Sequence, residues 1–143
     1  MLRPAFIRRV ASRIDRLDQE TLRDFVRTLA EERDFFQIIF DSMTEGVLLT
    51  DREGIVQYAN NTASVLLARR AEAVCGQPVL ECIDSIDFYN LVRAAIFENE
   101  RVRNREISLY IPSDRILNVN IFPLVRAETV HGHVIIFMDI TRE

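Results

Sequence analysis

The chain has 143 residues, of which 48% are hydrophobic and 28% charged, and its formal net charge is −4. This composition is typical of one globular domain with an extension, and the acidic balance argues against nucleic-acid binding. No apolar run is long enough to cross a membrane, and all eighteen basic residues are arginine, which excludes a Schiff-base lysine.

Residues 1–17 form a basic segment with helical periodicity. One side of the pattern is apolar and consists of Phe6, Ile7, Val10, Ile14 and Leu17. The other side carries Arg8, Arg9, Arg13 and Arg16. The pattern fits a helix on a membrane surface. We favour the alternative, in which this helix packs on its own domain or on a partner.

A second helix is predicted from about Asp18 to Met43. Its apolar residues follow each other at alternating steps of three and four residues, except that Glu32 occupies one of these positions. The seam consists of Leu22, Phe25, Leu29, Phe36, Ile39 and Met43. Such heptad spacing predicts a homodimer through a coiled coil, whereas a single amphipathic helix could instead cover its own domain's sheet. We expect residues 1–32 to be an N-terminal extension and residues 33–143 to be the domain.

A β-hairpin is predicted after this helix. Two short apolar runs, 47–49 and 55–59, flank an acidic tetrapeptide that begins at Asp51 and ends at Gly54. Asp51 can accept backbone N–H bonds inside the turn, and Gly54 can adopt a positive φ. Asn60 ends the second strand and is suited to cap the helix that follows.

The remaining chain predicts several short helices and then three strands. A longer helix is expected from Asp84 or Ser85 to about Asn99. The strand pattern then occupies residues 102–111, 115–125 and 134–140. The predicted fold class is α+β, with a five-stranded antiparallel sheet, short helices on one face and an N-terminal helical extension.

Four features in this order resemble the PAS sensory domain family. They are Glu45-Gly46, Asp51-x-x-Gly54 followed by Asn60, Gly76 before a short turn, and Asp139-Ile140-Thr141 at the end. The resemblance covers about residues 33–143 and implies a signal-input or dimerisation module. Our leading hypothesis is a non-enzymatic domain of a bacterial sensor histidine kinase. The resemblance also implies an output domain beyond Glu143, entered through Asp139 and Thr141. The alternative is a small-molecule or cofactor sensor joined to a transcription regulator or a cyclic-dinucleotide enzyme.

The resemblance argues against haem and flavin. Haem-binding members use a histidine on the long helix, which has none here, and His131 and His133 are expected in a surface turn. Flavin-binding members share a Gly-Arg-Asn-Cys-Arg-Phe run, in which Val79 takes the place of the cysteine. Cys75 and Cys82 are expected to be small, buried residues, and their low number favours a reduced, cytoplasmic setting. No metal site or catalytic set is expected.

A ligand pocket, if present, is expected between the inner face of the sheet and the long helix. The candidate lining residues are Leu49, Val56, Tyr58, Cys82, Phe88, Leu117, Val119, Ile121, Ile135 and Phe137. Almost all of them are apolar, whereas a polar metabolite needs several converging donors. We therefore favour a filled core, and a bound small molecule stays the alternative.

Overall fold

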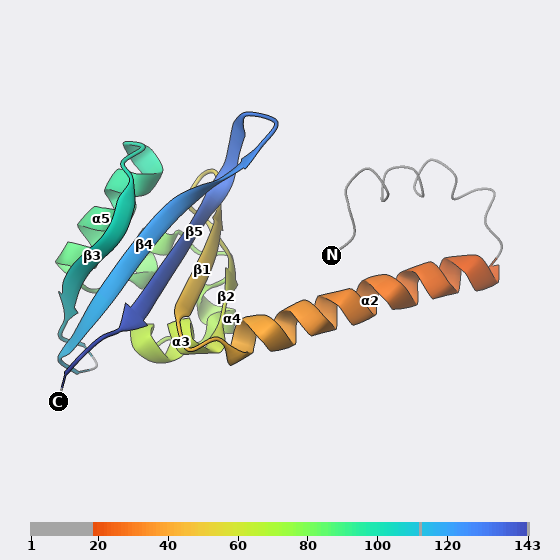
Figure 1. Cartoon of the computed structure of the whole chain (residues 1–143), viewed down its shortest axis with the longest axis horizontal. Helices are drawn as coiled ribbons and strands as arrows, with labels where there is room; N and C mark the ends of the chain where they lie inside the picture. The colour runs from red at the N-terminus through yellow and green to blue at the C-terminus, as the bar shows by residue number, and fades with distance from the viewer. Residues whose placement is uncertain (1–18, 112, 143) are drawn as a thin grey trace. The chain divides into compact units, whose positions relative to one another are not determined.

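The computed structural model describes residues 19–111 and 113–142 (Figure 1). The chain divides into two compact units, Met1–Phe40 and Asp41–Glu143. The predicted basic helix of residues 1–17 lies outside the described residues. Among the described helices, none combines the length and the apolar character needed to span a membrane.

Helix α2 runs from Gln19 to Ser42 and accounts for the described part of the first unit, with its last two residues in the second. The seam residues Leu22, Phe25, Leu29 and Phe36 are half-buried, and Glu32 shares this class of exposure. Outside the seam, Phe35 and Ile38 are each 66% exposed. The heptad stripe is thus half-buried over most of its length, but its member Ile39 is 48% exposed and adjoins the exposed Phe35 and Ile38.

The second unit contains a five-stranded antiparallel sheet. Its strands are β1 (Gly46–Asp51), β2 (Val56–Ala59), β3 (Val102–Leu109), β4 (Arg115–Arg126) and β5 (Thr129–Asp139). Their order in the sheet is β2-β1-β5-β4-β3, which places β5 at the centre. The predicted fold class and element order are confirmed.

The helices of this unit lie on one face of the sheet, behind the strands in Figure 1. They are α3 (Asn61–Leu67), α4 (Ala71–Val74), the 3₁₀ turn η2 (Val79–Cys82) and α5 (Ile86–Phe97). We call this side the inner face. The register puts Leu48 opposite Ile135 and Ile135 opposite Ile121, so these side chains share the inner face. Phe137 meets Phe88 of α5 edge to face, with ring centroids 5.2 Å apart.

The outer face of the sheet carries the alternate residues of the same strands. Val47, Ile136 and Asn120 lie opposite one another there, as do Leu49, Val134 and Phe122. Val47 and Val134 are buried, whereas Phe122 is 45% exposed. The outer face therefore carries several apolar side chains beside the polar Asn120.

Candidate functional site

The β1–β2 turn is closed by Asp51. Its Oδ1 atom accepts hydrogen bonds from the backbone N–H groups of Glu53 and Ile55, both at 2.9 Å. Gly54 adopts φ +87° in this turn, a conformation that is strained for residues with a Cβ. The roles predicted for Asp51 and Gly54 are confirmed, and both are structural.

Asn60 connects three segments and is fully buried. Its Oδ1 atom accepts from the N–H groups of Val47 and Ala63, each at 2.9 Å, and its Nδ2 atom donates to the carbonyl of Glu45. One side chain therefore caps α3 and fixes the start of β1. The predicted capping role is confirmed, and the link to β1 adds to it.

A polar cluster holds the end of β5. The Oδ1 atom of Asp139 accepts from the backbone N–H of Thr141 at 2.9 Å and from its hydroxyl, while Oδ2 accepts from Arg115. Thr141 Oγ1 in turn accepts from the N–H of Ile116 at 2.9 Å. The hydrogen bonds from Thr141, followed by Arg115, lower the pKa of Asp139. We call Arg115, Asp139 and Thr141 the exit clamp, because they tie the last residues of the chain to β4.

Eight of the ten predicted lining residues gather in the core between the inner face and the helices. They are Val56, Cys82, Phe88, Leu117, Val119, Ile121, Ile135 and Phe137. The placement of Leu49 and Tyr58 on this side was wrong. In β1 the inward residues are Leu48 and Thr50, so Leu49 and its partner Tyr58 face outward. Because β2 has an extra, bulged residue, Val56 pairs with Thr50 and faces inward although Tyr58 does not. Tyr58 consequently lies on the outer face, 47% exposed.

His133 also departs from the prediction of a surface turn. It lies within β5, and its side chain is only 5% exposed, directly opposite Thr50 of β1. Burial lowers the pKa of His133, which favours the neutral imidazole. Its Nδ1 atom and Thr50 Oγ1 are both buried and have no hydrogen-bond partner among the residues that the structure describes. Sequence periodicity did not indicate that His133 is buried in a strand, because His133 lies close to a predicted turn.

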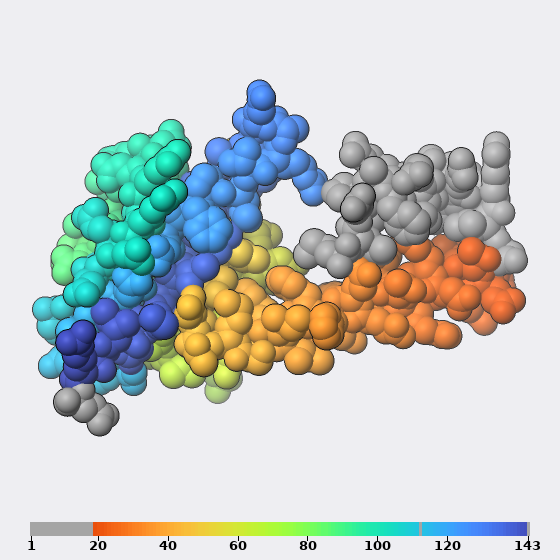
Figure 2. Space-filling model, in the orientation of Figure 1, coloured from red at the N-terminus to blue at the C-terminus, as the bar shows by residue number. Residues whose placement is uncertain are grey.

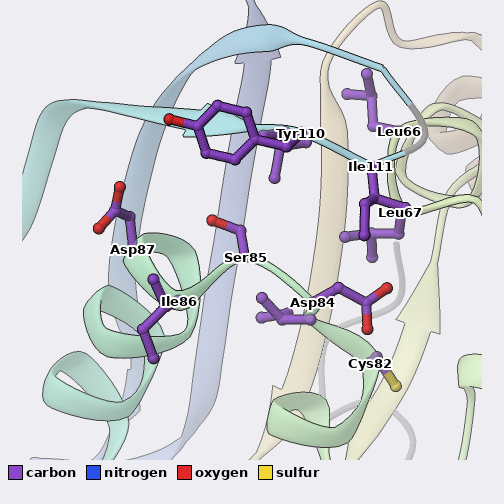
Figure 3. A pocket seen from close by; sticks show the side chains of 11 residues that line it. Leu66, Leu67, Cys82, Asp84, Ser85, Ile86, Asp87, Tyr110 and Ile111 are labelled. Atoms are coloured by element: carbon purple, nitrogen blue, oxygen red, sulfur yellow. The ribbon is translucent and has the colours of Figure 1, made fainter.

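A cavity of about 230 Å³ opens beside the core, between α3, the start of α5 and the end of β3 (Figure 3). Only Cys82 of the predicted lining residues borders it, and burial raises the pKa of that thiol. Asp84 pairs with Arg69 at 3.0 Å. Ser85 Oγ donates to the carbonyl of Ser108 and accepts from the N–H of Phe88. Asp84 and Ser85 are thus engaged within the protein.

Within the described part of the chain, no group of three or more His, Cys, Asp or Glu side chains is placed to hold a metal ion.

Comparison with known proteins points to one family. The family model described as the PAS fold matches residues 34–140. The chain is 27% identical over 131 residues to the signal transduction histidine-protein kinase AtoS of Escherichia coli, covering 85% of this chain but only 20% of that protein.

Solved structures agree with this match at the level of the fold. The PAS domain of BvgS from Bordetella pertussis superposes with a TM-score of 0.58 and 13% identity, covering 78% of this chain and 88% of that one. The PAS domain of nitrogen regulation protein NR(II) from Vibrio parahaemolyticus gives a TM-score of 0.54 with 17% identity, over 73% and 96% of the two chains.

Proposed function

We propose, because the chain belongs to the PAS family, that it is the signal-input domain of a bacterial sensor histidine kinase in a two-component system. AtoS, the relative matched over a fifth of its length, is named as a histidine-protein kinase. The observation that carries the proposal is the exit clamp. It couples the central strand β5 both to β4 and to the residues through which an output domain would be joined.

The proposed mechanism is a shift between two populated arrangements of the strand ends. β5 pairs with β1 on one side and with β4 on the other, so a change at either neighbour reaches Asp139. The clamp then converts a small displacement of β5 into a different direction of the following segment. The domain itself needs no catalytic group for this task.

The test uses the full-length protein that carries this sequence. Asp139→Asn and Thr141→Val should change the rate of autophosphorylation on histidine in the presence of ATP, while circular dichroism of the input domain stays unchanged. Asp114→Asn is the control, because Asp114 is exposed and lies outside the clamp. The proposal fails if no histidine is phosphorylated, or if the clamp variants and the control all behave as wild type.

We further propose that the protein is a homodimer through α2. The seam residues Phe25 and Leu29 repeat at heptad spacing and are half-buried in one chain. Complete burial of such a side chain contributes ~1.5–3 kcal/mol, and these half-buried side chains gain only part of that on association, before the cost of association. The double variant Phe25→Glu, Leu29→Glu should be monomeric in light scattering with the β-sheet signal retained. A wild-type protein that is monomeric at tens of micromolar would contradict this.

The proposed domain works in the cytoplasm without haem or flavin. Cys75 and Cys82 are free thiols, which suits a reducing compartment. The centre of the inner face is filled by Phe88 and Phe137, both fully buried, where a large planar cofactor would need space. The purified protein should show no visible absorption band, and a band that survives dialysis with stoichiometric cofactor would overturn the proposal.

The second candidate is a small-molecule sensor attached to a transcription regulator or a cyclic-dinucleotide enzyme. The cavity of about 230 Å³ favours it, because that space can hold a small apolar molecule beside Leu66, Leu67 and Leu109. Native mass spectrometry of the protein purified from its own host would reveal a retained metabolite. Ser85→Phe, which places a large side chain at the cavity, should abolish that mass shift if this candidate is right.

A further inference from the structure

A buried polar pair lies between β1 and β5. Thr50 and His133 are direct partners in the sheet, two residues along their strands from Leu48 and Ile135, so both side chains face inward. Their exposed fractions are only 3% and 5%. Over the described residues, neither Thr50 Oγ1 nor His133 Nδ1 finds a hydrogen-bond partner. Buried polar atoms are nearly always paired, so this pair requires an explanation other than stability.

The row of side chains around this pair carries no charge. Val56 lies opposite Thr50 on one side, and Pro123 lies opposite His133 on the other. A Cβ atom on Gly132 would lie 2.0 Å from the carbonyl oxygen of Thr50, so the β1 backbone approaches β5 closely here. A positive charge on His133 would therefore be buried without a counter-charge in its row, which costs free energy.

Charged and titratable groups do occur on the segments around this row. They are Asp51–Glu53 in the β1–β2 turn, Glu98 at the end of α5, Arg126 on β4 and His131 on β5. The Asp51 carboxylate accepts hydrogen bonds within its turn, and Glu98 pairs with Arg93 at 3.1 Å. Burial alone lowers the pKa of His133. The buried imidazole is therefore neutral at pH 7.

The pair also lies where the five-stranded part of the sheet ends. The pairing of β1 with β5 stops one residue further on, at Asp51 and Gly132, and beyond it β5 pairs with β4 alone. The tip of the β4–β5 hairpin, blue in Figure 2, stands clear of the neighbouring strands. The end of a strand pairing opens at a lower free energy than its middle. β1 and β5 can consequently separate here while the core stays folded.

We propose that His133 and Thr50 form a proton-sensitive switch. Protonation of the imidazole places a charge on the inner face, and the end of the β1–β5 pairing opens to bring that charge into water. The displacement of β5 reaches Asp139 of the exit clamp, which lies six residues further along the same strand, about 20 Å away. The inference rests on the proposed signal-input function and names its signal, a fall in pH.

The direction of the effect follows from the two forms of this switch. In the closed form, with the strands paired, the pKa of His133 lies below the value of about 6.5 of a solvated imidazole. The open form therefore binds more protons as the pH falls below about 6.5. The ratio of open to closed protein rises by up to about tenfold per pH unit, until the closed-form pKa is reached. Above that window the closed form is favoured.

An NMR titration of the 143-residue chain from about pH 8 to pH 5 tests the switch. The imidazole of His133 should titrate at a lower pH than that of His131, which is exposed. The backbone amide of Thr141, which donates to Asp139, should shift with the midpoint of His133. His133→Gln should abolish this step. His131→Gln is the matched control, two residues away in β5, and should retain it.

Thr50→Val tests the other member of the pair. Valine keeps the branched shape of threonine but has no hydroxyl, so the row loses its one polar neighbour of the imidazole. The midpoint of His133 should then move to lower pH. His133→Leu is a second variant that cannot titrate, and circular dichroism at pH 8 should match wild type for all these variants. An unchanged His133 midpoint in Thr50→Val would overturn the pairing of the two residues in one switch.

The full-length protein that carries this sequence provides a second measurement. The ratio of wild-type to His133→Gln autophosphorylation should change about fivefold or more between pH 7.5 and pH 6, because the ratio cancels the pH dependence of catalysis itself. The ratio of wild type to His131→Gln should stay constant. A constant ratio for His133→Gln, or a Thr141 amide that ignores the His133 midpoint, would overturn the switch. If no histidine is phosphorylated at any pH while Thr141 follows His133, the kinase proposal fails and the switch stands.

Discussion

The inner face of the sheet and the polar joints at its ends are stabilised in different ways. On the inner face, many apolar side chains fill one continuous core, including Leu48, Leu117 and Phe137. At the joints, a single polar side chain satisfies several backbone groups, as Asn60 does at the start of β1 and Asp51 does in the first turn. The stability of the core therefore depends on how completely apolar side chains fill it, whereas the stability of each joint depends on the hydrogen bonds of one residue.

This difference bears on how a signal could pass through the domain. A close-packed core resists small rearrangements, because a change in volume of even one methylene disturbs the packing of the neighbouring side chains. A joint formed by a few hydrogen bonds near the surface opens at lower free energy. The exit clamp is such a joint, since Asp139 and Arg115 are partly exposed. Strand ends can consequently shift while the core stays folded.

The largest effect is expected for the core. Phe137→Ala should lower the free energy of unfolding by about 3–5 kcal/mol, because it leaves a cavity against Phe88 and the neighbouring strands. The matched control is Met138→Ala, the next residue on the outer face, which is 37% exposed and should cost about 1 kcal/mol or less. Urea unfolding followed by circular dichroism measures both. Equal losses of unfolding free energy in the two variants would mean that the inner and outer faces contribute equally to stability.

A buried joint should show an intermediate effect. Asn60→Ala removes three hydrogen bonds and leaves the N–H groups of Val47 and Ala63 without their partner, so a loss of about 2–3 kcal/mol is expected. Asn60→Asp keeps the accepting oxygen but loses the donor to Glu45. Its free energy of unfolding should therefore lie between those of wild type and Asn60→Ala. If Asn60→Ala has the same urea midpoint of unfolding as wild type, the hydrogen bonds of Asn60 do not stabilise the domain.

The exposed turn should show a smaller effect. Asp51→Ala should cost about 1 kcal/mol, through the lost hydrogen bonds to Glu53 and Ile55. Arg52→Ala in the same turn is the control and should be close to neutral, because Arg52 is exposed and lies outside those hydrogen bonds. An unchanged unfolding midpoint for Asp51→Ala would mean that the turn hydrogen bonds of Asp51 do not contribute to stability.

Sequence periodicity predicted the fold and most of the core, because alternation along β4 separates Leu117, Val119 and Ile121 from the outer face. It also predicted the joints that follow from local turn and cap chemistry, such as Asp51 and Asn60. It failed where pairing between strands decides the outcome. The β2 bulge moved Tyr58 outward, and β5 extended far enough to bury His133. Arg115 was missed at the exit clamp, because its partner Asp139 is 24 residues away along the chain.

The smallest effect is expected at the exit clamp, and it should depend on pH. Hydrogen bonds from Thr141 and then Arg115 lower the folded-state pKa of Asp139 below its unfolded value of about 3.9. The ionised carboxylate therefore stabilises the folded form above that value, and this contribution is lost as the pH falls through the folded pKa. Because the side chain is 28% exposed, Asp139→Asn should cost less than about 1 kcal/mol at pH 7.

Unfolding free energies of wild type and Asp139→Asn, measured from pH 7 down to pH 2, test this dependence. Their difference should be constant above about pH 4 and should shrink toward zero in acid, where both side chains are neutral. Asp114→Asn is the control, since Asp114 is exposed and lies outside the clamp, and its small difference from wild type should vary little. A difference for Asp139→Asn that stays constant down to pH 2 would show that the charge of Asp139 does not hold the clamp, and that only the shape of its side chain matters there.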